Sequence, residues 1–326
     1  MDSNVSKNTH SHKLFKVSLA IERPHVSVKS ALKKLLLSTL NLDRQKFALT
    51  LDHEFVAETL NRKIKLSTRN NQQFSSANKP GITLFTSKLM SIGYDCPLGL
   101  FLAASCQVSL PEVVDRLSAL FRLNNLTDRS SLELHLEIAA TGWLNFYLDS
   151  RSIATWLEQS LLSIQSDTVS TSTTELRSTP AKLFQVQYIH ARCCSLLRLG
   201  ARENLIVLKG DRQQTGWQIE QPSSISWLNT EHNLWLSEPA EYELLRQLLM
   251  VTDAQSECGD RPNWSKIALC LSRATAIFDA ESRFLGEVKV RSSSKAIARL
   301  GLIALAQYWL EKILLEKLNL AAPKTL

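Results

Sequence analysis

The chain of 326 residues lacks the long apolar segments that would place it in a membrane or send it for secretion. No apolar run approaches about 18 residues without a charge, so a transmembrane helix is not expected. The N-terminus, MDSNVSKNTHSHKLFK, is polar and has no apolar signal core. The six cysteines form no CxxC pair and show no metal-ligand spacing with histidine. We therefore expect reduced thiols, no metal site and a cytoplasmic location.

Short motifs for nucleotide binding and nucleophilic catalysis are also missing. The sequence contains no GxGxxG, no GxxxxGK[ST] and no GxSxG. Glu133 and Glu137 are paired carboxylates, but they fall on the polar face of an alternating strand, where solvent exposure accounts for them. The sequence therefore offers no catalytic residues and indicates no cofactor.

Positive charge is concentrated at the two ends of the chain. The net charge is +7, and residues 1–80 hold 14 Lys and Arg against 6 acidic residues. Residues 261–326 hold 11 Lys and Arg against 5 acidic residues, whereas the middle of the chain is acidic. Such a distribution is typical of contacts with a polyanion such as RNA. A solvated basic tail and a helix with one positive face would explain it equally well.

The N-terminal half mixes helical and extended patterns. Residues 131–139 alternate apolar and polar side chains and predict a half-buried strand, followed by a turn at Thr141-Gly142 and a second strand over 143–148. Asp149 or Ser150 is suited to cap the helix that comes next.

Four further segments complete the N-terminal half. Helical spacing predicts helices over 26–41, around 85–93 and over 97–105, and Pro111 suits the first turn of another. The polar and basic residues 61–80 indicate a loop.

The C-terminal half reads almost entirely as helix. Helices are predicted over 184–199, from Glu238 onward, over 263–284 and through the closing stretch from residue 292, and residues 210–236 form an irregular connector. The length suits about two domains. We therefore predict an α+β protein with an α/β module at the N-terminus and an all-α bundle at the C-terminus.

One helix in particular suggests a family. Residues 184–198, FQVQYIHARCCSLLR, resemble the arginyl-tRNA synthetase helix usually read as (V)QYAHARxCSxLR, which leads out of the catalytic domain into the anticodon-binding bundle. In that family several hundred residues of ATP- and arginine-binding domain precede this helix. Here the polar segment 166–182 stands in that place. The resemblance implies a relative that keeps both flanking modules and lacks the class I catalytic domain.

The N-terminal module resembles the additional domain of the same family, which grips the tRNA D-loop. Residues 134–159 are similar to the family's "vEiAgpGFiNffLs" element, with Gly142 and Asn145 on the motif's own letters and Trp143 in place of Phe. The segment 83–104 resembles the family's upstream run more loosely, because Thr86 and Ser87 replace its polar D-loop residues. The resemblance implies domain boundaries of 1–165 for this module, 166–182 for the linker and 183–326 for the bundle.

The C-terminal module resembles the DALR anticodon-binding domain. SEPAEYELLRQLL, the helix after Asn263 and the closing ARLGLIALAQYWLEKILLEKLNLAAP each match a family element. The basic face of this region supplies the candidate RNA contacts, which are Lys289, Arg291, Lys295 and Arg299 for phosphates and Tyr308 as an aromatic surface, although helical spacing also suits Tyr308 to the core. The signature helix supplies candidates for a domain junction or partner interface, which are Tyr188, His190 and Arg192.

The catalytic motifs of the family are missing from the sequence. None of the seven histidines forms the HxGH pair of a class I synthetase, and Lys88-Leu89-Met90-Ser91 is only superficially similar to the KMSK loop. We therefore expect a non-catalytic protein that binds tRNA, with arginine tRNA implied by the resemblance alone. The rival expectation is an adaptor, because removal of a catalytic domain uncovers apolar surface that a partner protein or a second copy can cover.

Overall fold

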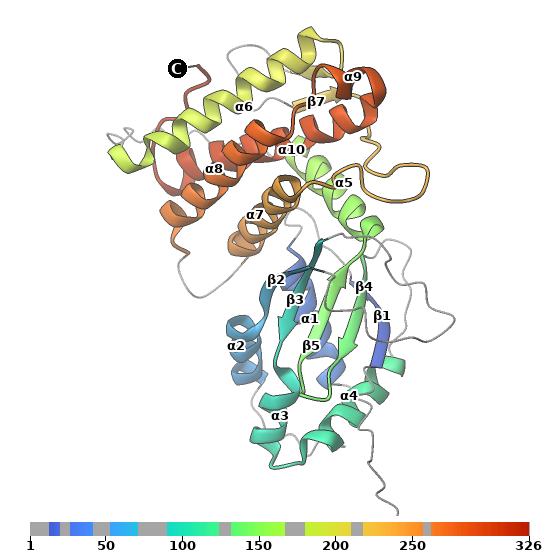
Figure 1. Ribbon diagram of the computed structural model, residues 1–326. Coiled ribbons are helices and arrows are strands. Elements are labelled where there is room, and N and C mark those ends of the chain that lie inside the picture. The colour runs from blue at the N-terminus through green and yellow to red at the C-terminus, as the bar shows by residue number, and fades with distance from the viewer. Residues whose placement is uncertain are drawn as a thin grey trace, which may run out of the picture. The chain divides into compact units, whose positions relative to one another are not determined.

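The computed structural model describes residues 13–19, 27–41, 53–70, 90–123, 132–166, 180–209, 218–256 and 262–325 (Figure 1). These residues form two compact units: the first holds most of the described chain up to Asp149, and the second holds Ser150 onward together with Ser27, Val28, Asn70 and Met90. A five-stranded sheet dominates the N-terminal unit and helices dominate the C-terminal unit, so the chain is α+β.

The first unit is built on a sheet with the strand order β1-β4-β5-β3-β2. The strands are β1 (Lys13–Leu19), β2 (Lys65–Asn70), β3 (Met90–Cys96), β4 (Leu132–Ile138) and β5 (Leu144–Leu148). β1 pairs with β4, β4 with β5 and β5 with β3, all antiparallel. The apolar face carries fully buried side chains such as Leu136, which lies opposite Phe146 in the β4/β5 register.

Four helices complete this unit. They are α1 (Val28–Asn41), α2 (His53–Lys63), α3 (Leu98–Cys106) and α4 (Leu110–Leu123). Leu32 and Leu36 of α1 and Leu117 and Phe121 of α4 are almost fully buried. Burial of these side chains follows the apolar spacing of the sequence, as expected for amphipathic helices.

The strand–turn–strand prediction over residues 131–148 is confirmed. Gly142 adopts φ of 81° in the turn, a conformation that glycine adopts without strain. The backbone of α3 approaches this turn closely, since the Gly99 amide donates to the Gly142 carbonyl at 2.9 Å. A Cβ added at Gly142 would lie 2.9 Å from the Leu100 amide nitrogen, so a side chain here would collide with backbone.

Two predictions for the N-terminal half are wrong. The segment around 85–93 was expected to be helical, but residues from Met90 onward form strand β3, in which Ile92, Tyr94 and Cys96 alternate toward the core. The expected loop over 61–80 instead begins with the end of α2 and strand β2. The polar N-terminal tail contains strand β1. Thr86, Ser87 and the rest of the 71–89 segment lie outside the described residues.

Glu137 also differs from its expected exposure. Its side chain is only 5% exposed, and its Oε2 accepts hydrogen bonds from the Tyr147 hydroxyl at 2.9 Å and the Asn145 amide at 3.3 Å. Both donors lie on the neighbouring strand β5. Glu137 is therefore a buried and hydrogen-bonded carboxylate, unlike the exposed Glu133 on the same strand face.

The second unit is a helical bundle arranged around one buried helix. Its helices are α5 (Ser150–Ser166), α6 (Phe184–Arg202), α7 (Pro239–Ser256), α8 (Trp264–Glu281), α9 (Glu287–Arg291) and α10 (Ser293–Lys312). From Ala298 to Lys312 every residue of α10 is buried, and α10 contacts all the other helices of this unit. A helix that is buried all round must carry its polar residues in internal pairs.

The sequence predicted an all-α bundle at the C-terminus, but this unit also contains a small sheet. Strand β6 (Val207–Lys209), just before the expected connector, and strand β7 (Gln218–Gln221), inside it, form a two-stranded antiparallel sheet. After β7, Ile225 and Trp227 pack on α10 at Gly301, where an added Cβ would lie 2.6 Å from the Trp227 ring. Gly301 therefore makes room for the Trp227 ring against the buried helix.

Helix α5 belongs to the second unit by its contacts. It packs against α10, its Glu158 accepts a hydrogen bond from the Trp227 indole at 3.0 Å, and its Ile164 carbonyl accepts one from Gln218 at 3.2 Å. Helix α5 therefore belongs to the same compact unit as the helices that follow it. Most of the predicted linker, residues 167–179, lies outside the described residues.

Candidate nucleic-acid interface

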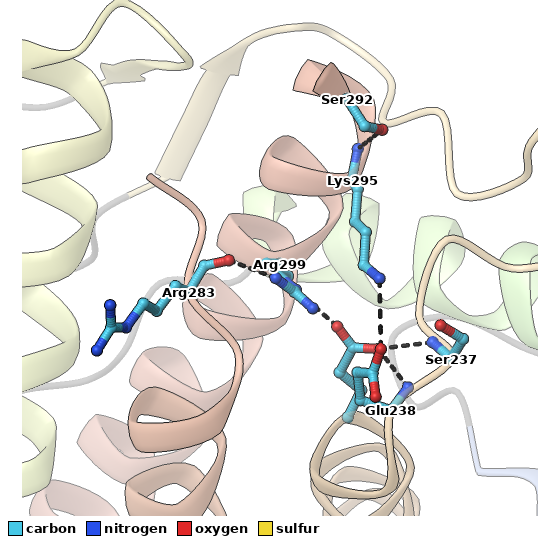
Figure 2. Close-up of polar contacts among 7 residues, drawn as sticks. Ser237, Glu238, Arg283, Ser292, Lys295 and Arg299 are labelled. Atoms are coloured by element: carbon cyan, nitrogen blue, oxygen red, sulfur yellow. Dashed lines mark hydrogen bonds and ion pairs between the residues drawn. The ribbon is translucent and has the colours of Figure 1, made fainter. Parts of the chain in front are cut away.

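Arg299 lies inside the protein and not on its surface. Its side chain is 5% exposed, and its Nε donates to Glu241 Oε1 at 2.6 Å (Figure 2). A second donor of the guanidinium binds the Arg283 backbone carbonyl. Glu241 is fully buried and also accepts the Ser237 and Glu238 amides at 2.6 and 2.8 Å. The expectation that Arg299 faces a phosphate is corrected: this residue ties α10 to the start of α7.

Lys295 and Tyr308 are also turned toward the protein. Lys295 Nζ lies 3.7 Å from Glu238 Oε1, and its side chain is only 21% exposed. The Tyr308 ring is 5% exposed, stands edge-on to Trp309 at 5.4 Å between centroids, and its hydroxyl accepts from Lys312. Tyr308 therefore serves the core, the second of the two roles that its spacing allowed.

Lys289 and Arg291 lie on the short helix α9 with their charged groups accessible. Lys289 Nζ pairs with Glu203 at 2.7 Å, and Arg291 pairs with Glu287 at 2.7 Å with both side chains more than two-thirds exposed. Because both pairs are exposed to solvent, water and salt screen the attraction between their charges. The Lys289–Glu203 pair also fixes α9 beside the C-terminal end of α6.

The predicted junction residues separate onto different faces of α6. His190 is fully buried, while Tyr188 is 51% exposed. Arg192 is half exposed and its guanidinium forms two hydrogen bonds to Asp279 on α8, at 2.8 and 3.4 Å. The hydrogen bond to Asp279 raises the Arg192 pKa. His190 is therefore not available to a partner in this conformation, whereas Tyr188 and Arg192 are.

A row of accessible side chains runs along α6, and two of its members, Phe184 and Arg202, were not among the candidates from the sequence. Phe184 is 55% exposed, which is unusual for a phenylalanine. Phe184, Tyr188 and Arg192 follow one another at intervals of four residues, so they share one helix face. The exposed Arg202 lies on the same side at the end of the helix. We call Phe184, Tyr188, Arg192 and Arg202 the α6 row; the i, i+4 spacing was the signal that could have found it.

The α6 row and α9 form one candidate surface. Phe184 and Arg202 are about 27 Å apart along the helix axis, given 1.5 Å per residue. The row begins with two aromatic rings, continues with arginines, and ends next to Glu203, which pairs with Lys289 of α9. Aromatic rings beside a track of positive charge are the chemistry of single-stranded nucleic-acid binding.

Other kinds of site have less support. Within the described ranges, no three His, Cys, Asp or Glu side chains are grouped so that they could hold a metal ion. None of the helices in those ranges combines the length and hydropathy needed to cross a bilayer. No family model, curated protein or solved structure matches the chain. The family resemblance therefore rests on the sequence motifs alone.

Proposed function

We propose that this chain is a non-catalytic RNA-binding protein that takes tRNA-sized RNA on its C-terminal helical unit. The observation that carries the proposal is the α6 row, in which two exposed aromatic rings precede exposed arginines beside the basic helix α9. The resemblance of residues 184–198 and of the closing helix to arginyl-tRNA synthetases supports tRNA as the ligand. It also supports the additional-domain and anticodon-bundle identities of the two units and a cytoplasmic location.

The proposed contacts differ from those expected from the sequence. Phe184 and Tyr188 stack on bases, and Arg192, Arg202, Lys289 and Arg291 approach phosphates. Three residues expected to contact RNA instead make contacts inside the helical unit: Lys295, Arg299 and Tyr308. Arginine tRNA as the preferred species is what the resemblance implies, and sequencing the RNA that co-purifies with the full chain identifies the ligand.

Binding of a fluorescent tRNA transcript, followed by anisotropy at several salt concentrations, tests the proposal. We expect Phe184→Ala or Tyr188→Ala to weaken binding between about fivefold and a hundredfold, because each stacked base contributes roughly 1–3 kcal/mol. We expect Arg202→Ala to lower the slope of log affinity against log salt by about 0.7–0.9. Arg273→Ala removes an exposed arginine of α8 outside the row and serves as the matched control.

Two results would reject RNA binding by this surface. In the first, the variants of the α6 row bind RNA as tightly as the parent chain, while the Arg273→Ala variant binds it less tightly. In the second, the affinity stays flat between low and physiological salt, since phosphate contacts release counterions.

The same exposed rings favour a second function, an adaptor that binds another protein. Phe184 and Tyr188 present apolar area that monomeric proteins usually cover. Under this hypothesis, affinity capture with the full chain recovers a protein partner in equal amount, and Tyr188→Ala weakens its recovery. If the capture recovers tRNA and no protein, and the row variants no longer recover tRNA, the result favours RNA binding.

A further inference from the structure

Residues 320–325, after the end of α10, run along α6 without regular secondary structure. Three α6 side chains hold this segment through its backbone: Gln187 donates to the Ala321 carbonyl at 2.8 Å and Arg198 to the Lys324 carbonyl at 3.1 Å. The third, His190, meets the Pro323 carbonyl through Nδ1 at 2.9 Å. Gln187 and His190 lie beside the α6 row and not in it, and Arg198 stands one turn before Arg202 at the end of the row.

Beneath this segment lies a cluster of buried polar groups from α6 and α10. Gln307 Nε2 lies 3.1 Å from His190 Nε2 and 3.0 Å from Glu311 Oε2, and Cys194 Sγ lies 3.9 Å from His190 Nε2. Because the Pro323 carbonyl can only accept, His190 must carry its proton on Nδ1 and accept from Gln307 on Nε2. The segment therefore completes the hydrogen bonding of the cluster.

The charge of Lys324 adds to this fit. Burial raises the pKa of Glu311, and the nearby Lys324 acts in the opposite direction by favouring the carboxylate. Burial likewise raises the pKa of the Cys194 thiol to about 12, and Glu311, Arg198 and Lys324 all lie near enough to influence it. Lys324 of the docked segment thus lies near enough to Glu311 to favour its ionised form.

The attachment of the segment is weaker than the packing of the helices. Ala321, Ala322, Pro323 and Lys324 are only half-buried, and Leu320 is the one buried side chain among residues 320–325. The chain enters the segment through a π-helical turn, Ile313–Lys317, and then Asn319, whose φ is 53°. Segments with few buried apolar contacts open locally before the core unfolds.

We propose that residues 320–325 form a releasable strap, whose undocking from α6 opens the cluster of His190, Cys194, Gln307 and Glu311 to solvent while the helical unit stays folded. The strap controls access to a thiol that sits beside an imidazole. This proposal does not depend on whether the chain binds RNA.

The adjacent Cys193 provides an internal control. Cys193 is also fully buried, and this burial raises its pKa well above the ordinary value, but it lies on another side of α6, near Asp279 of α8. Release of the strap therefore exposes Cys194 alone, whereas unfolding of the unit exposes both thiols.

The test is labelling of the full chain with N-ethylmaleimide under native conditions, with tandem mass spectrometry to assign the label to Cys193 or Cys194. We expect Cys194 to react faster than Cys193 in the parent chain. Gln187→Leu and Arg198→Met each remove one strap bond and should speed Cys194 labelling about fivefold to tenfold, with Cys193 unchanged. Arg273→Met, outside the strap, should change neither rate.

The proposal is overturned if both cysteines react at the same rate in every variant, because that result means that only global unfolding exposes them. It is equally overturned if Gln187→Leu and Arg198→Met leave Cys194 labelling unchanged. The labelling rates of Cys193 and Cys194 can be compared in the parent chain alone, so the test remains possible even if a variant fails to fold.

Discussion

The buried pair of Arg299 and Glu241 provides the sharpest test of how the helical unit is held together. Arg299→Met keeps much of the side-chain length and removes the charge. It leaves Glu241 as a fully buried carboxylate without its cationic partner, and the Arg283 carbonyl without this donor. The two carboxylate-bound amides of Ser237 and Glu238 remain.

The magnitude follows from those contacts. Breaking a buried ion pair by removing one partner typically lowers the free energy of unfolding by about 3–5 kcal/mol. The two remaining amide donors still stabilise the Glu241 carboxylate, so we expect a loss near the lower limit, about 3 kcal/mol. A second substitution, Glu241→Gln, removes the stranded charge but keeps an oxygen for both amides. The double variant should therefore regain part of the stability that Arg299→Met loses.

Urea unfolding followed by tryptophan fluorescence measures these changes, since Trp156, Trp227, Trp264 and Trp309 all lie in the second unit. Arg291→Met is the matched control, because its pair with Glu287 is exposed and pairs of that kind contribute about 0.3–0.5 kcal/mol. If Arg299→Met is as mild as Arg291→Met, or if the double variant is no more stable than the single one, the reasoning fails.

Two further predictions concern pH and backbone conformation. Burial lowers the pKa of His190 from 6.5 to about 4, so between these values the unfolded chain binds a proton that the folded chain does not. Stability should be full above pH 6.5 and fall by up to about 3 kcal/mol as the pH drops to 4, with Glu311, whose pKa is raised, acting in the opposite direction. Urea midpoints across this range measure the loss, and a slope unchanged in His190→Gln contradicts it. Gly142→Ala should destabilise the first unit by at least about 1–2 kcal/mol, because alanine is strained at φ of 81° and its Cβ meets the Leu100 backbone. Circular dichroism during urea unfolding measures this loss, and a melt unchanged from that of the parent chain contradicts it.

Local sequence patterns gave most of the elements but not all of the strands. The alternation over 132–138 and the glycine turn at Gly142 predict β4 and β5 because strand periodicity and turn chemistry are local properties. The sequence predicted a helix where strand β3 begins. The alternation of Ile92, Tyr94 and Cys96 is short, and Gly93 within it has no side chain to mark the opposite face. Gly93 lies where an added Cβ would be 2.2 Å from the Phe146 carbonyl oxygen, and that constraint comes from a strand about 50 residues away.

The candidate site depended more heavily on the tertiary structure. The sequence by itself determined the α+β class, the helical spacing that places Phe184, Tyr188 and Arg192 on one face, and the excess of positive charge near the end of the chain. Only the tertiary structure decided which charges reach solvent: Arg299 is buried against Glu241, while Arg291 on α9 is exposed. Helical periodicity fixes the direction of a side chain relative to its own helix, but burial depends on which helices pack around it. Because other helices surround α10, its basic and aromatic side chains make contacts inside the protein. The exposed aromatic and basic side chains of the candidate surface lie on α6 and α9 instead.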